Sequence, residues 1–278
     1  GLKSLEEMRG ISAEELLQLY GKSGRFGFPS VIDNYFLPNS LPEIFEAEKQ
    51  AQIPLLVGWN SAEIPGASLM KEKAFTKENY TQIIKELYPE DYERVLALYP
   101  VGDPAQIRKS ATDLASDRFI VYSTWKWFDL HRKNSDQPVY RYVFDKIRPP
   151  LKDKSKVAGL AGGTSEKKEE TATTPPKPIG AAHAAEIEYA FNNLATATEF
   201  EWSKEDKQVA QVMFSYFANF IKNANPNHDE LPTWPGVKAT AESPILINIG
   251  VKTEAQQATT DDRYLFLDHA YRKEKSKK

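Results

Sequence analysis

The side chains of this sequence best suited to acid–base chemistry are its four histidines, His131, His183, His228 and His269. His183 has small residues on both sides, in the run Gly-Ala-Ala-His-Ala-Ala-Glu, so the backbone can approach closely and leave the imidazole free. An imidazole has a pKa near neutrality, which suits a general base. The alternative is a surface histidine in an alanine-rich loop, and composition alone leaves both readings open.

Glu63 is the candidate acid, because it comes just after the continuous apolar run of residues 53–59. Open α/β sheets place functional groups beyond the carboxyl ends of buried strands. A solvated loop acid is the alternative for any single glutamate in such a place. His131, between Leu130 and Arg132, is instead expected in the last turn of a helix, interacting with the helix dipole.

Metal and cofactor chemistry find no support in the sequence. No two histidines have the spacing of metal ligands, and there is no cysteine to form a thiolate site or a disulfide. A glycine-rich phosphate loop and a dinucleotide fingerprint are both absent. The nucleophile motif G-x-S-x-G occurs nowhere, and the nearest run, Gly21 to Gly24, lacks its spacing. The residues alone therefore give a possible base and acid without a nucleophile.

The bulk composition is that of a globular protein. The chain has 278 residues, of which 41% are hydrophobic and 27% charged. Its net charge of −3 is too small to favour nucleic acid or an anionic membrane as a partner. No apolar run is long enough for a membrane span, and the first residues do not resemble a signal peptide. The compartment stays open, although the lack of cysteine and the lysine-rich character favour an exported bacterial protein.

The expected elements alternate between strands and helices. Apolar, β-branched runs predict strands at residues 53–59, 139–144 and 245–249, and a short strand or hairpin arm at 31–38. Capping signals and apolar periodicity predict helices at 12–20, 77–87, 90–99 and 203–223, another from Asp103-Pro104, and a short one after the capping box of Ser40 and Glu43. This alternation predicts a mainly parallel α/β sheet flanked by helices.

We expect residues 1–278 to form part of a single domain. Residues 152–178 contain no aromatic residue and few large aliphatic ones, so they predict a flexible, low-complexity surface insertion. The lysine-rich end, residues 272–278, is expected to be a solvated tail rather than a docking segment.

Several segments, in order along the chain, resemble the type-B carboxylesterase and cholinesterase-like family of the α/β-hydrolase fold. Residues 28–38 are similar to that family's P-V-x-D-G-x-F-L-P segment, and residues 54–63 to P-L-L-x-G-x-N-x-D-E-G. Residues 180–191 are similar to G-A-x-H-G-x-E-I-x-Y-x-F, and residues 217–235 to the W-x-x-F-A-x-x-G-x-P-N … W-P ending. The resemblance covers nearly the whole chain.

The resemblance implies roles for particular residues. Glu63 matches the acid and His183 the base of the catalytic triad, and Glu186 matches a glutamate that supports the site without touching substrate. Asp117 lies in a segment similar to a family helix near the site, with a structural role as the alternative. Ile64 and Ala184 depart from the family, because both replace a glycine and so restrict the backbone.

In this fold the triad runs Ser, then acid, then His along the chain, and only the acid and the histidine are present here. The resemblance therefore implies the C-terminal portion of an α/β-hydrolase fold, completed by an N-terminal half that carries the serine and the oxyanion hole. The implied function is a carboxylic ester hydrolase with a small-molecule ester as substrate. The rival hypothesis is a non-catalytic binding or adhesion protein, since the family contains such members; these typically lose triad residues.

Overall fold

The computed structural model describes residues 3–24, 30–159, 163–166, 177–240 and 244–276, and it divides into two compact units, Gly1–Glu43 and Ile44–Lys278. The first unit contains helices α1 (Leu5–Arg9) and α2 (Ala13–Lys22), neither of which has a buried residue. The hydroxyl of Ser12 caps α2 by accepting the N–H of Glu15, at 3.2 Å, as the capping box predicted.

The strand or hairpin arm predicted at residues 31–38 is wrong, because these residues form a bend. The side chain of Asp33 accepts the backbone N–H groups of Tyr35 and Leu37, each at 3.0 Å, and Asn34 has a left-handed φ of 60°. Local side-chain bonds of this kind compete with strand pairing. Helix α3 (Leu41–Glu46) follows and crosses the boundary between the two units.

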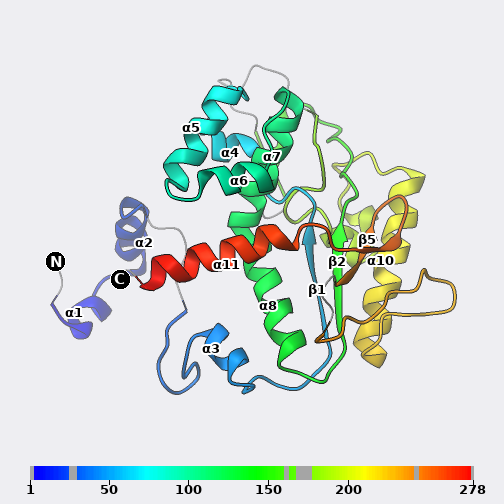
Figure 1. Ribbon diagram of the computed structural model, residues 1–278, viewed down its shortest axis with the longest axis horizontal. Coiled ribbons are helices and arrows are strands. Elements are labelled where there is room, and N and C mark those ends of the chain that lie inside the picture. The colour runs from blue at the N-terminus through cyan, green and yellow to red at the C-terminus, as the bar shows by residue number, and fades with distance from the viewer. Residues whose placement is uncertain (1–2, 25–29, 160–162, 167–176, 241–243, 277–278) are drawn as a thin grey trace. The chain divides into compact units, whose positions relative to one another are not determined.

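The second unit is built on a four-stranded sheet with the order β1-β2-β5-β6 (Figure 1). Strands β1 (Leu55–Asn60), β2 (Val139–Phe144) and β5 (Ile245–Ile249) run parallel, and β6 (Glu254–Gln257) pairs antiparallel with β5. The strands predicted at 139–144 and 245–249 are confirmed to the residue, and β1 begins two residues after the start of its predicted run.

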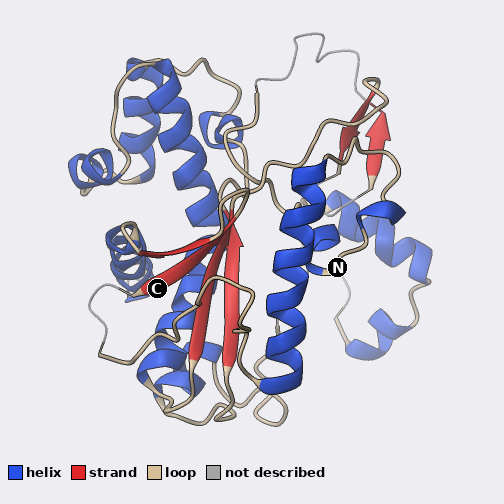
Figure 2. Ribbon diagram, turned by 90° about the vertical axis from the view of Figure 1, so that its right-hand side faces the viewer, coloured by secondary structure: helices blue, strands red, loops and turns tan. Residues whose placement is uncertain are grey.

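Helices cover both faces of this sheet (Figure 2). Alternate side chains of β1, Val57 and Trp59, pack against Trp125 and Phe128 of α8 (Tyr122–Lys133), beside α11 (Asp261–Ser276). The other face carries α10 (Lys204–Asn223), which packs against Tyr140, Tyr142 and Phe144 of β2 and, with these tyrosines, surrounds the buried Trp234. Successive side chains of a strand point to opposite faces of the sheet. Because helices cover both faces here, apolar side chains are needed on both faces of these strands.

A helical group follows β1 and packs around a core that also includes Phe266 and Leu267 of α11. It consists of α4 (Gly66–Met70), α5 (Lys77–Leu87), α6 (Tyr92–Leu98) and α7 (Pro104–Ser116). Asp103 caps α7 and Pro104 begins it, as predicted. A five-residue π-helical segment, η1 (Asp117–Val121), then connects α7 directly to α8.

The described part of the segment 152–178 contains a small hairpin. Strand β3 (Lys156–Ala158) pairs antiparallel with β4 (Thr164–Glu166), while residues 160–162 and 167–176 of the predicted insertion lie outside the described residues. The expected tail is helical as far as Ser276, because α11 continues through it, with an i,i+4 ion pair between Arg272 and Asp268. Within the described residues, no helix has the length and apolar character needed to cross a membrane.

Candidate active site

Glu63 and His183 meet beyond the carboxyl ends of β1 and β2. The Nδ1 atom of His183 lies 2.6 Å from the Oε2 atom of Glu63. Their backbones also meet, since the N–H of His183 donates to the carbonyl of Glu63 at 3.2 Å. The two residues are 120 positions apart in the sequence. The structure therefore brings together the two residues expected to form the acid–base pair.

Asn60, the last residue of β1, connects the acid loop to the histidine loop. Its backbone N–H donates to Oε1 of Glu63 at 2.7 Å, so both carboxylate oxygens are occupied. Its side-chain amide donates to the carbonyl of Ala182 at 2.7 Å and also to the carboxylate of Glu186. Glu186 thus contacts Asn60, which in turn bonds to Glu63.

Ser61 and Gly180 set the spacing of the same two loops. The hydroxyl of Ser61 accepts the N–H of Ala181 at 2.9 Å, and the N–H of Ala62 donates to the carbonyl of Ala181 at 2.9 Å. A Cβ on Gly180 would lie 2.5 Å from the Ser61 hydroxyl and 2.9 Å from the Cβ of Ala62. Only glycine allows this approach, so Gly180 fixes how closely the histidine loop packs on the acid loop.

The electrostatics of the pair follow from unequal burial. The Glu63 residue is only 4% exposed, and this burial raises the pKa of its carboxyl above the usual range. The N–H of Asn60 and the ring of His183 lower the same pKa, and so partly oppose the effect of burial. A carboxylate held in this way fixes the imidazole with its proton on Nδ1 and stabilises the charged ring when the other nitrogen takes a proton.

The histidine faces a pocket of about 780 Å³, and 28% of its side chain is exposed. Prolines and aliphatic residues form much of the lining, and so does Phe200. With Nδ1 engaged by Glu63, Nε2 is the nitrogen left to exchange a proton with a bound molecule. The arrangement can therefore act as a general base, and then as a general acid, toward a group in this pocket.

Helix α7 and the segment η1 contact the pair and its surroundings: α7 bonds to the backbone that follows Glu63, and η1 contacts the ring of His183. The backbone N–H of Ile64 donates to the hydroxyl of Ser116 at 3.2 Å, and that of Gly66 to the hydroxyl of Thr112 at 3.0 Å. Phe119 of η1 lies against the histidine in an edge-to-face contact, with the two ring centroids 5.2 Å apart. These contacts therefore come from Thr112, Ser116 and Phe119, and not from Asp117.

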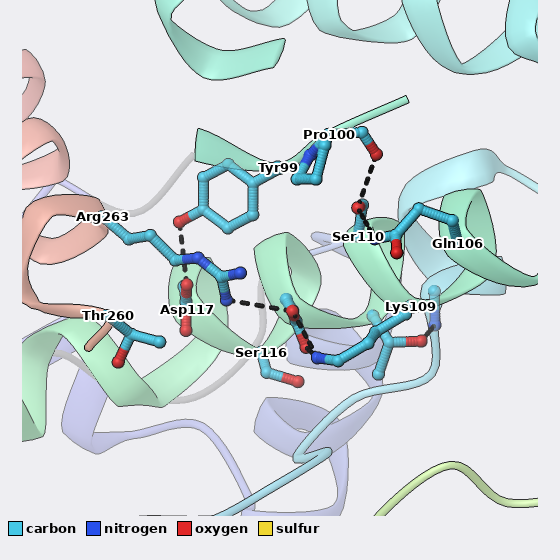
Figure 3. Close-up of polar contacts among 12 residues, drawn as sticks. Tyr99, Pro100, Gln106, Lys109, Ser110, Ser116, Asp117, Thr260 and Arg263 are labelled. Atoms are coloured by element: carbon cyan, nitrogen blue, oxygen red, sulfur yellow. Dashed lines mark hydrogen bonds and ion pairs between the residues drawn. The ribbon is translucent and has the colours of Figure 1, made fainter. Parts of the chain in front are cut away.

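Asp117 lies in a separate buried cluster (Figure 3). Its carboxylate accepts the hydroxyl of Tyr99 at 2.8 Å, and burial raises the pKa of Asp117 to about 7. Arg263 and Lys109 lie in the same cluster and both pair with Asp113, at 2.9 and 2.7 Å. This cluster lines a different, smaller pocket of about 190 Å³. The Asp117 carboxylate therefore contacts this cluster and not the Glu63–His183 pair or its pocket.

The departures from the family pattern differ in their consequences. Ile64 does not have a left-handed backbone, so its side chain is accommodated without strain. Ala184 does have one, with φ at 60°, where glycine would be free of strain.

His131 lies in the last turn of α8, as predicted, but it is buried, and its ring Nε2 lies 2.8 Å from the carbonyl oxygen of Ile53. Within the described ranges, no group of three or more His, Cys, Asp and Glu side chains is placed to hold a metal ion.

The sequence did not predict roles for Asn60 and Ser61, although their place in the same motif as Glu63 was a usable signal. Phe119, two residues from Asp117, was not predicted to contact the histidine. Arg148 was not predicted either; it lines the large pocket and donates to the carbonyl of Ala184 at 2.7 Å. That contact joins residues 36 positions apart, and no local pattern marks it.

The chain is similar to known proteins over most of its length. The model of the carboxylesterase family matches residues 2–267. Carboxylesterase 5A of Canis lupus familiaris is 27% identical over 91% of this chain and 43% of its own length. Acylcarnitine hydrolase of Mus musculus is 25% identical and cocaine esterase of Homo sapiens 24% identical, each over 82% of this chain and 39% of its own length.

The chain thus spans less than half the length of these curated relatives. With its largely parallel sheet flanked by helices and a family match across nearly all of its length, the chain belongs to the carboxylesterase family, whose fold is that of the α/β-hydrolases.

Proposed function

We propose that this chain supplies the acid, Glu63, and the base, His183, of a serine ester hydrolase. The observation that carries the proposal is the 2.6 Å contact between the two side chains beside a pocket of about 780 Å³. Membership of the carboxylesterase family and similarity to acylcarnitine hydrolase and cocaine esterase support an ester as the substrate. Retention of both triad residues favours an enzyme over a binding protein.

In the proposed reaction, Nε2 of His183 takes the proton of a serine hydroxyl as that oxygen attacks the ester carbonyl. The imidazolium then returns the proton to the leaving alcohol, and the acyl-enzyme is hydrolysed by water in the same manner. Glu63 keeps the ring in the required tautomer and stabilises its positive charge. The oxyanion donors, which often make the largest electrostatic contribution, are supplied by the same half of the protein as the serine.

The pocket indicates where the ester lies. It is bounded on one side by the base and on the others mainly by apolar groups, among them Pro149, Pro150, Leu151 and Phe200. Such a lining favours an apolar acyl or alcohol portion, because burying that portion releases ordered water and costs no hydrogen bonds.

The partner in this proposal is an N-terminal half of the same protein, which carries G-x-S-x-G. Strand β1 lies at one end of the four-stranded sheet, and its sequence, Leu-Leu-Val-Gly-Trp-Asn, is that of a strand inside a sheet. An exposed edge of this kind is open to pairing with a further strand. Leu16, Leu17 and Leu19 of α2 are also exposed in this chain. The N-terminal half would pair with β1 and cover such apolar residues.

The test begins with the coding sequence upstream of this chain, read for G-x-S-x-G. The protein that includes this upstream part is called the longer protein from here on, and it is assayed for hydrolysis of p-nitrophenyl butyrate. The 278-residue chain alone and a His183→Gln variant of the longer protein are assayed in parallel. We expect activity only in the unmodified longer protein. A longer protein that folds but lacks the motif, or that hydrolyses the ester equally well without His183, would contradict the proposal and favour a non-catalytic binding protein.

A further inference from the structure

A strained residue directly follows the candidate base. Ala184 has a φ of 60°, a conformation that glycine adopts freely and that costs energy for a residue with a Cβ. The residue is also buried, at 7% exposed. Strained residues of this kind persist only where the surrounding structure holds them. Relaxation of this turn would move the backbone of His183, so whatever holds Ala184 also holds the imidazole.

A buried arginine, Arg148 in the segment after β2, contacts this turn. Its Nη2 atom donates to the carbonyl of Ala184 at 2.7 Å. The same guanidinium pairs with the carboxylate of Glu188 and lies 4.9 Å from the centre of the Phe200 ring. Its side chain is only 11% exposed. A carboxylate, an aromatic face and burial thus fix the guanidinium, and it can in turn fix a carbonyl.

We infer that Arg148 is a positioning residue, which holds the left-handed turn at Ala184 and thereby keeps His183 aligned with Glu63. The imidazole depends on this turn, because the Glu63 carboxylate and the Glu63 carbonyl both bond to residue 183. The catalytic consequence rests on the proposed function; the structural consequence does not.

Lysine could not replace this arginine. A planar guanidinium can bond a carbonyl and a carboxylate and still lie flat over an aromatic ring. An ammonium group is a compact charge without that fixed geometry, so Arg148→Lys would keep the ion pair with Glu188 while loosening the bond to Ala184.

The first test is a nuclear magnetic resonance measurement on the chain itself. The signal is the low-field proton of Nδ1–H in His183, which reports the short bond to Glu63. We expect this proton to broaden or disappear in Arg148→Met and to weaken in Arg148→Lys. In Ala184→Gly it should remain. The proton should also largely remain in the double variant that combines Ala184→Gly with Arg148→Met, because glycine adopts the turn without strain.

Circular dichroism confirms that each variant folds. If Arg148→Met unfolds, Arg148→Lys takes its place in the comparison.

The second test uses the longer protein and ester hydrolysis. Loss of residues that orient a catalytic group typically costs about 10- to 100-fold. We expect that loss in kcat for Arg148→Met, with a smaller change in KM, and a loss below about 10-fold when Ala184→Gly is also present. Equal losses in both backgrounds, or an unchanged His183 proton in Arg148→Met, would overturn the inference.

Arg132 provides a matched control. It is also a buried arginine, 8% exposed, that pairs with a carboxylate, Asp129 at 2.7 Å. It too donates to a backbone carbonyl, that of Ala239 at 2.8 Å, and lies over an aromatic ring, that of Phe128. Arg132→Met should lower stability and leave the His183 proton in place.

The two proposals fail separately. If the longer protein hydrolyses no ester but the proton responds as expected, the proposed function fails and the role of Arg148 stands. If ester hydrolysis is found and the proton does not respond to Arg148, the role of Arg148 fails alone.

Discussion

Two carboxylates in this molecule, Glu63 and Asp117, are buried to a similar degree but bind different partners. Both are at most 5% exposed, and burial raises the pKa of each. Glu63 is bound to an imidazole that faces a large pocket, whereas Asp117 is bound to the phenol of Tyr99, and burial raises the pKa of that phenol far above its ordinary value. Burial and an altered pKa do not by themselves make a catalytic site. A partner that exchanges protons near neutral pH, and access to a ligand, are also required.

The largest effect on the rate is expected when the base is removed. On the proposed function, His183→Gln should lower kcat of the longer protein by on the order of 10⁵ to 10⁶, because loss of the histidine would disable the triad almost completely. Stability should change little, since 28% of the side chain is exposed. Steady-state ester hydrolysis and thermal unfolding measure the two effects. A loss of less than 100-fold, outside the range for a triad base, would show that His183 is not that base.

The next largest effect is expected at the buried acid. Glu63→Gln keeps the shape of the side chain but removes the negative charge that favours the correct tautomer. We expect kcat to fall by on the order of 10³ to 10⁴. Asp117→Asn is the matched control in the other cluster, and its kcat should stay within a few-fold of the unmodified protein. Comparable losses in both variants would contradict the distinction drawn between the two carboxylates.

Asp117 should instead control how stability depends on pH. Its pKa is about 7 in the folded chain against 3.8 for an unperturbed group, so the folded state binds the proton more tightly. The stabilisation from this proton is complete below about pH 4 and is lost as the pH rises through 7. The loss is on the order of 2–4 kcal/mol.

The variant Asp117→Asn should remove this dependence, because the neutral amide mimics the protonated acid and can still accept from Tyr99. The charged neighbours Arg263, Lys109 and Asp113 are present in both proteins, so the comparison isolates the titration of Asp117. Chemical denaturation at pH 5 and pH 8 measures the effect. The expectation is wrong if both proteins lose the same free energy of unfolding between these values.

The smallest effect is expected at Phe119, which links the two regions because η1 begins at Asp117. Phe119→Leu keeps an apolar side chain but removes the edge-to-face contact with His183. Aromatic pairs contribute about 0.5–1.5 kcal/mol, so kcat should fall about 2- to 10-fold. The variant Phe119→Tyr should retain most of the rate. An unchanged kcat in Phe119→Leu would show that the ring contact does not position the base.

The sequence predicted the strands best where apolar runs were buried on both faces, as at 139–144 and 245–249. It did not predict β6, whose residues Glu254–Gln257 are all exposed and carry no apolar period; that strand forms because its backbone pairs with β5. The false strand at 31–38 shows the opposite error, because Asp33 bonds its own neighbours there.

The candidate site was predictable only in part. The family resemblance pointed to Glu63 and His183, since composition left each with an ordinary alternative. The tertiary contacts of Phe119 and Arg148 depend on the folded positions of η1 and of the segment after β2, and neither has a local pattern.

The most direct test of the central claim is covalent labelling of the longer protein with a fluorophosphonate probe, followed by intact-mass and peptide mass spectrometry. We predict one adduct, on a serine N-terminal to this chain within G-x-S-x-G, and none in the His183→Gln variant. A folded protein that takes no adduct would contradict the account. So would labelling that does not depend on His183, because the serine would then react without the base assigned to it.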